Sequence, residues 1–573
     1  MNVFFAEENI NTKDTYMIAQ SITICPIQIF TEISSSSYRH PRLRRRYRSY
    51  WYRRLHRHHR SSAAVIQTSH NDKVSEIASK AINISDPFKS SPKQSYEYED
   101  FSVAQFIRFL KQIKLKKLLC KINDTRQQLK INYKIDIILQ WALTVYFFRQ
   151  GSCNALQTAL QKLRPEKRTA ILKYLGFEED INSFPHRTVV NDCLKRIEAD
   201  EINELLIHLF NWAKRNKIFY NHMQILVPHG HFHVCIDGFS VHKYATPHAV
   251  NETGENICPY CLPRTRNKGK EKEVTYWIHG FVNVAIVFPG GLQLPLHVYP
   301  LKASQIQLEA NASDDDLKQE CELQAAKMIL PILKEKLGRL AVTLLTDSLY
   351  ANEPIIKLCE DLGWGYLIVR QEGSLKTVGR KCDELEGSKL YQQSYQAQET
   401  IKLKKGGTIE RTVKWFNRVT VGRESYTNVL RLEEIVKDAN GNPVKKKYFK
   451  TEWLCSTQIH KGNCFALVKR GRMRADHEDL HNSLKNRGFA AKHDYARANP
   501  NAWLVWKILM FVAFWIFELF SFTTLAQKSK GPSSWMAFAQ DLFSDLLKIP
   551  WEMISLSPSL KKEKIQFRFN FSP

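Results

Sequence analysis

Two aspartates stand where apolar strands are expected to end. Asp237 closes the short apolar run that begins at His233, and Asp347 closes the run that begins at Ala341. The end of a strand presents a side chain at the rim of a sheet. A single aspartate in such a place more often caps the next helix. Two of them, on strands that the predicted fold places side by side, indicate a site that could hold a divalent cation.

A third carboxylate comes from a predicted helix. Arg474, Glu478 and Lys485 are separated by four and seven positions, which are close to whole turns of 3.6 residues, so the three side chains share one face. Taken alone, this pattern is more often a surface ladder of ion pairs. Together with the two aspartates it forms a set of three carboxylates flanked by two cations.

The Arg474-x3-Glu478-x6-Lys485 spacing resembles the Tyr-x2-Arg-x3-Glu-x6-Lys signature of a large group of bacterial insertion-sequence transposases of the DDE type. The sequence departs at the first position, where Gly471 replaces the tyrosine. The resemblance covers about residues 232–525 and is weaker in the helical region before them. Three further stretches are similar to this group: Lys318-Gln319-Glu320-Cys321-Glu322, Thr346-Asp347-Ser348-Leu349-Tyr350-Ala351-Asn352 and Leu484-Lys485-Asn486-Arg487-Gly488-Phe489.

The resemblance implies an α/β fold with a ribonuclease-H-like catalytic core and two Mg²⁺ ions, for which Mn²⁺ can substitute, about 3.5–4 Å apart. Asp237 would bridge both ions, while Asp347 and Glu478 would each complete one. Arg474 and Lys485 would hold DNA phosphates. Some relatives space the acidic helix one residue differently, which leaves Asp479, and less favourably Asp476, as rivals for the third ligand.

The implied function is cut-and-paste transposition, in which a homodimer or higher oligomer cleaves DNA at the terminal inverted repeats of a transposon and transfers the freed strand into target DNA. The implied location is the bacterial cytoplasm, associated with the nucleoid. The alternative is a transposase-derived protein that binds DNA without cleaving it. Gly471 and an unusual basic N-terminus keep this alternative open.

The Cys258-Pro259-Tyr260-Cys261 pair lies in a loop between two predicted strands. Two cysteines at this spacing could be half of a zinc site, with His242, His248 or His279 as partners. No second Cys-x-x-Cys pair accompanies them, and the alternative is a loop with two free thiols. The surroundings show no thioredoxin-like context, so a redox role is less favoured.

The composition points to a polyanionic partner. The chain carries 84 Lys and Arg against 57 Asp and Glu, a formal net charge of +27. Solubility needs far less charge, so DNA is the expected partner and a membrane surface the weaker alternative.

The 12 cysteines are scattered and no signal peptide is recognisable, which indicates a reducing cytosol. Residues 502–527 are apolar, but Lys507 and Glu518 interrupt them, so a fully buried core helix is favoured over a membrane span.

The predicted elements divide the chain into six parts. Residues 1–97 contain a basic and aromatic tract, residues 38–60, with no apolar periodicity, and are expected to be disordered. The 131-residue interval between Asp347 and Glu478 (478 − 347) has room for a β-rich insertion. The parts are residues 1–97 as a basic extension, 98–225 as a helical DNA-binding domain, 226–370 and 466–530 as two halves of a ribonuclease-H-like core, 371–465 as the insertion and 531–573 as a C-terminal tail.

The core is expected to contain three strands, a helix over about 315–337, a strand, a helix over about 353–362 and a further strand. Trp415, Phe416 and Trp453 of the insertion could stack on a flipped base. The favoured interpretation is that they form the small core of the inserted strands.

Overall fold

The computed structural model describes residues 102–571 apart from 178–183, 220–229, 268, 303–313, 389–394, 405, 423–424, 498 and 550–566. These residues all belong to one compact unit, which begins at Glu97. The predicted basic extension, residues 1–97, lies outside the described residues. The helical segment, the core and the insertion are therefore described together.

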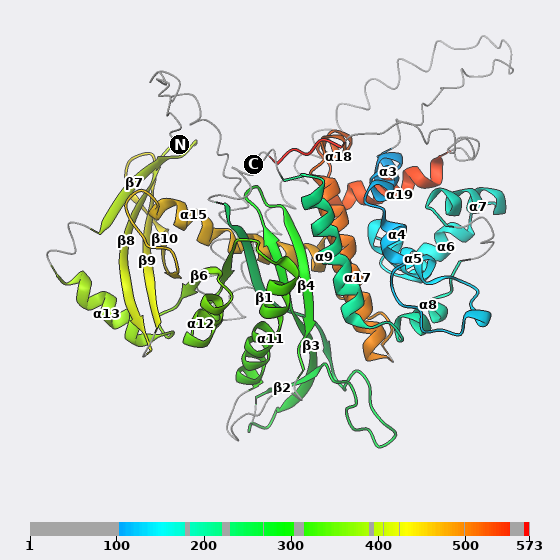
Figure 1. The fold of residues 1–573 in the computed structure, drawn as a ribbon, viewed down its shortest axis with the longest axis horizontal. Coiled ribbons are helices and arrows are strands. Elements are labelled where there is room, and N and C mark those ends of the chain that lie inside the picture. Colours follow the sequence, from blue (N-terminus) through cyan, green and yellow to red (C-terminus); the bar gives the residue numbers. More distant parts are fainter. Residues whose placement is uncertain are drawn as a thin grey trace, which may run out of the picture. The chain divides into compact units, whose positions relative to one another are not determined.

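A mixed sheet runs through this unit (Figure 1). Its ten strands follow the order β2-β3-β1-β5-β6-β10-β9-β8-β7, and β4 pairs with the remaining length of β3. The strands are β1 (Phe232–Tyr244), β2 (Cys261–Arg266), β3 (Val274–Val287), β4 (Gln293–Pro300), β5 (Val342–Thr346), β6 (Gly365–Arg370), β7 (Gln396–Lys402), β8 (Thr408–Val421), β9 (Ser425–Lys437) and β10 (Pro443–Cys455).

The expected mixed α/β architecture is confirmed. Strands β1, β5 and β6 are parallel, whereas β3 lies antiparallel to β1 and to β4. Helices α11 (Asp314–Leu337) and α12 (Glu353–Asp361) connect these strands, within one residue of the predicted bounds. Strand β1 extends seven residues beyond Asp237, because β3 is long enough to pair with it as far as Tyr244.

The inserted strands belong to the same sheet as the core strands. Strand β10 pairs antiparallel with β6, so that Trp453 lies opposite Val369, and β9, β8 and β7 follow outward. The insertion was expected to consist of short strands and turns, and this was wrong in two respects. Strands β8, β9 and β10 are 13 or 14 residues long, and α13 (Lys376–Glu386) opens the insertion as a helix that buries Val378 and Cys382. Trp415, Phe416 and Trp453 are at most 3 % exposed. Trp415 and Trp453 lie together in the smaller buried cluster, as expected, whereas Phe416 packs into the main core.

One long apolar helix, α17 (Pro500–Ser521), lies between the sheet and the helical segment (Figure 1). It packs against β4 and against helices α5 and α9. By length and composition it could cross a membrane, but 94 % of its most apolar window is buried within the structure. This burial agrees with the predicted core helix.

The helices of the N-terminal segment are α3 (Ser102–Gln112), α4 (Leu115–Leu119), α5 (Ile135–Phe147), α6 (Cys153–Gln161), α7 (Pro165–Tyr174), α8 (Arg187–Leu194) and α9 (Ala199–Arg215).

The C-terminal part is more regular than its sequence pattern suggested. After α18 (Thr524–Lys530), helix α19 (Trp535–Lys548) begins at the cap Ser534, whose hydroxyl accepts a hydrogen bond from the backbone of Ala537. Apolar residues at Phe538, Leu542 and Leu546 recur every four positions, and this face of the helix is buried. The segment predicted as a C-terminal tail therefore contains a packed helix.

Candidate active site

Strand register places Asp237 and Asp347 side by side. In the parallel pair of β1 and β5, Cys235 lies opposite Leu345, and each aspartate follows two residues later, level with the end of β5. Neighbouring strands lie about 4.8 Å apart. Asp347 also accepts a hydrogen bond from the backbone N–H of Leu349 at 3.1 Å. It therefore also caps the short helix that follows β5. Both aspartates are partly exposed.

Helix α16 (Arg474–Asn486) brings a carboxylate and a cation to the same rim. The Arg474 guanidinium donates a hydrogen bond to Glu478 Oε1 at 2.5 Å, one turn along the helix. Burial tends to lower the pKa of Arg474, but the charges of Glu478, Asp237 and Asp347 outweigh burial and raise it. One guanidinium is therefore within electrostatic reach of all three predicted carboxylates.

The environment of Asp237 is strongly acidic. Burial raises the pKa of the Asp237 carboxyl to about 7, and the neighbouring carboxylates of Asp347, Glu322 and Glu478 add to this effect, while Arg474 opposes it. Repulsion among like charges that are close together is the physical cause. A divalent cation bound by oxygen ligands would relieve this repulsion, so the chemistry of the donor set fits Mg²⁺ or Mn²⁺.

The two rivals of Glu478 have other surroundings. Asp479 accepts a hydrogen bond from the guanidinium of Arg487 at 2.8 Å. Burial, together with the charge of Asp479, raises the pKa of Asp476 to about 7. Neither residue is among the charges that shift Asp237. The structure therefore groups Glu478 with the two aspartates.

The inner face of α16 also presents two histidines that the spacing analysis did not consider. His481 Nδ1 lies 4.0 Å from Asp237 Oδ2, and the rings of His477 and His481 are 4.8 Å apart. Burial, with the charge of Arg474, lowers the pKa of His477 to about 3, and burial likewise holds the pKa of His481 well below its usual range. Both are neutral near pH 7. Their positions, three and seven residues after Arg474, share the helix face that the spacing had already selected.

Lys485 lies farther along the same face. Its ammonium group is 4.3 Å from the centre of the Phe239 ring, two residues beyond Asp237 on β1. The structure therefore places Lys485 beside the strand that carries the first aspartate, at the edge of the carboxylate group.

Glu322 is a fourth carboxylate that the sequence analysis did not select. It lies on α11 and is 5 % exposed. A Cβ atom at Gly238 would lie 2.1 Å from Glu322 Oε1, so the carboxylate rests directly against the backbone beside Asp237. Side chains alternate between the two faces of a strand, so Glu322 approaches from the face opposite to Asp237. Its membership of a stretch that resembles transposases was the one signal in the sequence.

The position of the missing tyrosine has a physical explanation. Gly471 lies in α15 (Cys464–Arg472), and a Cβ atom there would be 2.6 Å from Cε2 and 2.7 Å from Nε1 of the Trp453 indole. The space that a side chain would need is already filled by a buried tryptophan from β10. A tyrosine could not stand here without moving it.

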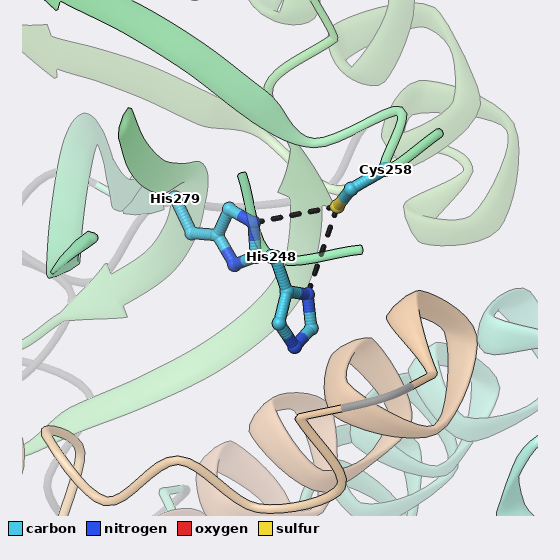
Figure 2. A group of neighbouring side chains, drawn as sticks. All are labelled: His248, Cys258 and His279. Carbon is cyan, nitrogen blue, oxygen red and sulfur yellow. Dashed lines mark hydrogen bonds between the residues drawn. The ribbon is translucent and has the colours of Figure 1, made fainter. Parts of the chain in front are cut away.

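A second cluster of candidate ligands lies around the Cys258–Cys261 pair. The metal-ligating atoms of His248, Cys258 and His279 all lie within 4.8 Å of one another (Figure 2). Cys261 Sγ is 3.0 Å from His279 Nε2. The hydrogen bond from Cys261 lowers the pKa of the Cys258 thiol, and both imidazoles add to this effect. The side chain of His242 lies outside the described part of the structure.

Comparisons with known proteins identify no family. No family model matches the chain, and no curated protein matches its sequence significantly. The function therefore has to be inferred from the residues and their geometry.

Proposed function

We propose that the protein is a metal-dependent DNA transposase of the DDE class, with Asp237, Asp347 and Glu478 as its metal ligands. One observation carries this proposal: the strand register sets the two aspartates level on adjacent parallel strands, and Arg474 links Glu478 to them. Apart from the additional short strand β2, the elements from β1 to β6 follow the predicted order of three strands, helix, strand, helix, strand, which is the order used by the ribonuclease-H-like fold and supports the same assignment. The excess of positive charge supports a DNA substrate.

Each residue of the site has a role that follows from its chemistry. When bound, divalent ions activate a water molecule and stabilise the leaving 3′ oxygen in phosphodiester cleavage. Asp237, Asp347 and Glu478 supply the hard oxygen ligands. Arg474 holds Glu478 in place, and its remaining donors can bind a DNA phosphate with Lys485. His481, neutral and buried beside Asp237, limits the movement of that carboxylate.

A matched pair of variants tests the assignment of the third ligand. We expect Glu478→Gln to lower the rate of Mg²⁺-dependent DNA cleavage at least about a hundredfold, because a lost ligand removes several kcal/mol of transition-state stabilisation. Asp479→Asn changes the adjacent residue, which pairs with Arg487 outside the site, and should leave the rate within about threefold of wild type. The substrate is a plasmid that carries the genomic DNA on either side of the gene, with cleavage followed by gel electrophoresis.

DNA binding is measured in parallel with cleavage. If both variants and the wild type bind the DNA but none nicks it with Mg²⁺ or Mn²⁺, the protein is the non-catalytic alternative. If Asp479→Asn is the inactive variant, the ligand assignment is wrong although the function stands. Full activity in both variants would contradict the DDE assignment.

Glu322 provides a finer prediction. We expect Glu322→Gln to slow cleavage by about 10- to 100-fold, the range typical of groups that support metal ligands without contacting the metal. The reason is that its carboxylate lies against Gly238 and adds negative charge beside Asp237. The control is Glu320→Gln, which changes a carboxylate that hydrogen-bonds to Gln324 on the same helix. Equal rates in the two variants would show that Glu322 has no role in the site.

A further inference from the structure

The four side chains around the Cys258–Cys261 pair come from three places in the chain. Cys261 begins β2, Cys258 and His248 lie in the loop before it, and His279 lies on β3. In the antiparallel pair of β2 and β3, Cys261 stands opposite His279. The pairing of these strands therefore brings the second histidine to the cysteines.

Three sulfur-to-nitrogen distances in the cluster suit a tetrahedral ion. Cys258 Sγ lies 3.7 Å from His248 Nδ1 and 3.4 Å from His279 Nε2 (Figure 2), and Cys261 Sγ lies 3.0 Å from the same nitrogen of His279. With bonds of about 2.3 Å to sulfur and 2.0–2.1 Å to nitrogen, a tetrahedral site separates sulfur from nitrogen by about 3.5 Å. The observed separations are close to this value.

The cluster is closed to solvent. All four side chains are at most 5 % exposed. The ring of Trp503 from α17 lies 4.4 Å from that of His279, and the ring of Tyr244 lies 5.1 Å from it. Structural zinc sites have four protein ligands and no open position, whereas catalytic sites keep one position for water or substrate.

The groups around the cluster orient its members as in metal sites. The backbone N–H of His248 donates to Cys261 Sγ at 3.1 Å, which favours a thiolate. His248 turns Nδ1 to the cysteine and Nε2 toward Asp494, whose Oδ1 lies 4.0 Å away and accepts a hydrogen bond from the Tyr244 hydroxyl at 3.1 Å. Ligating histidines commonly direct their second nitrogen to a carboxylate in this way.

We propose that Cys258, Cys261, His248 and His279 bind one structural Zn²⁺ ion, with Asp494 as the outer partner of His248. Two sulfur and two nitrogen ligands in tetrahedral arrangement select zinc over Mg²⁺, which prefers oxygen. This site is separate from the carboxylate group and does not depend on the proposed function.

The position of Asp494 gives the ion a structural role. Asp494 lies between α16, which carries Glu478, and α17. The buried ammonium of Lys507 on α17 donates to the carbonyls of Ala491 and His493 at 2.8 Å, so the same segment is held from both sides. The zinc site thus fastens the loop after β1 to the segment that follows the acidic helix.

The test measures metal in the purified full-length chain. We expect about one zinc per chain, and loss of most of it in Cys258→Ser and Cys261→Ser. The matched control is Cys359→Ser, which changes an equally buried thiol on α12. Asp494→Asn should release zinc to a chelator about 10- to 100-fold more readily than wild type.

If the cysteine variants fail to fold, replacing Zn²⁺ by Co²⁺ in the wild-type chain still tests the proposal. Co²⁺ bound to the wild-type chain should give sulfur-to-cobalt charge-transfer absorption and the intense visible bands of a tetrahedral site. Negligible zinc together with no such absorption, a disulfide between Cys258 and Cys261, or equal zinc loss in Cys359→Ser would each overturn the proposal. Glu478→Gln should retain full zinc content even if it cleaves no DNA, so the two proposals fail separately.

Discussion

Replacing Asp237 by asparagine is expected to abolish DNA cleavage and, at the same time, to make the metal-free protein more stable. Cleavage should fall at least about a thousandfold, because Asp237 is the ligand assigned to both ions. Stability should rise because an ionised carboxylate is removed from a partly buried site beside three other carboxylates. Such opposite effects on activity and stability are common at functional sites.

The gain in stability depends on pH in a defined direction. The pKa of Asp237 is raised from its ordinary 3.8 to about 7 in the folded chain. The folded state therefore binds more protons than the unfolded state between these values, and ionisation of Asp237 opposes folding increasingly as the pH rises through this window. The penalty is absent below about pH 4 and complete above about pH 7, where it reaches at most about 4 kcal/mol.

Thermal unfolding with and without Mg²⁺ checks this prediction. At pH 8 without metal, Asp237→Asn should unfold at a higher temperature than wild type, and at pH 5 the difference should shrink. Adding Mg²⁺ should raise the unfolding temperature of wild type but not that of the variant, because a ligand stabilises only the state that binds it. The control is Asp479→Asn, which changes an acidic side chain paired with Arg487. Equal stabilisation of wild type and Asp237→Asn by Mg²⁺ would argue against a metal at Asp237.

Adding even a methyl group at Gly471 is expected to destabilise the protein. Exchanging glycine for alanine within a helix ordinarily stabilises it by about 0.5–1 kcal/mol. Here the new Cβ would lie 2.6 Å from the buried indole of Trp453, so we expect a loss of about 1–3 kcal/mol instead. Gly471→Tyr, which restores the residue found in the resembling transposases, should be more severe.

A double-mutant cycle isolates this contact. Trp453→Phe removes the indole atoms that the new Cβ would meet, so Gly471→Ala should cost less in that background by about 1 kcal/mol or more. Gly373→Ala is the control, since nothing lies within 4 Å of its Cβ position. Unfolding by urea measures the free energies. If Gly471→Ala is neutral or stabilising, Trp453 does not explain why the tyrosine is missing.

Much of the core could be predicted from the sequence because its patterns are local. The strand that ends at Asp347 and the helix that ends at Leu337 are marked by continuous apolar runs or helical periodicity, and both lie within a residue or two of the predicted bounds. The pairing of β10 with β6 could not be predicted. It joins Trp453 to Val369 across 84 residues (453 − 369), and no local pattern encodes such a contact.

In the candidate sites, too, local spacing could be predicted from the sequence and contacts between distant elements could not. The spacing of Arg474 and Glu478 along one helix was readable, whereas the proximity of Glu322 depends on the absence of a side chain at Gly238 on a different element. The two cysteines were readable as half a metal site. His279 was one of three candidate partners, and the strand register that sets it opposite Cys261 could not be predicted.

The burial of α17 also has a consequence for how the chain is made. Helix α5 ends at Phe147, and its partner α17 begins at Pro500, 353 residues later (500 − 147). The ribosome adds about 5–20 residues per second, so α17 is synthesised about 20–70 s after the helix α5 that it covers. Strand β4, which α17 also covers, is likewise synthesised before this helix. The apolar surfaces of both would be open during that interval, so co-translational chaperones should bind the growing chain until residues 500–521 have emerged.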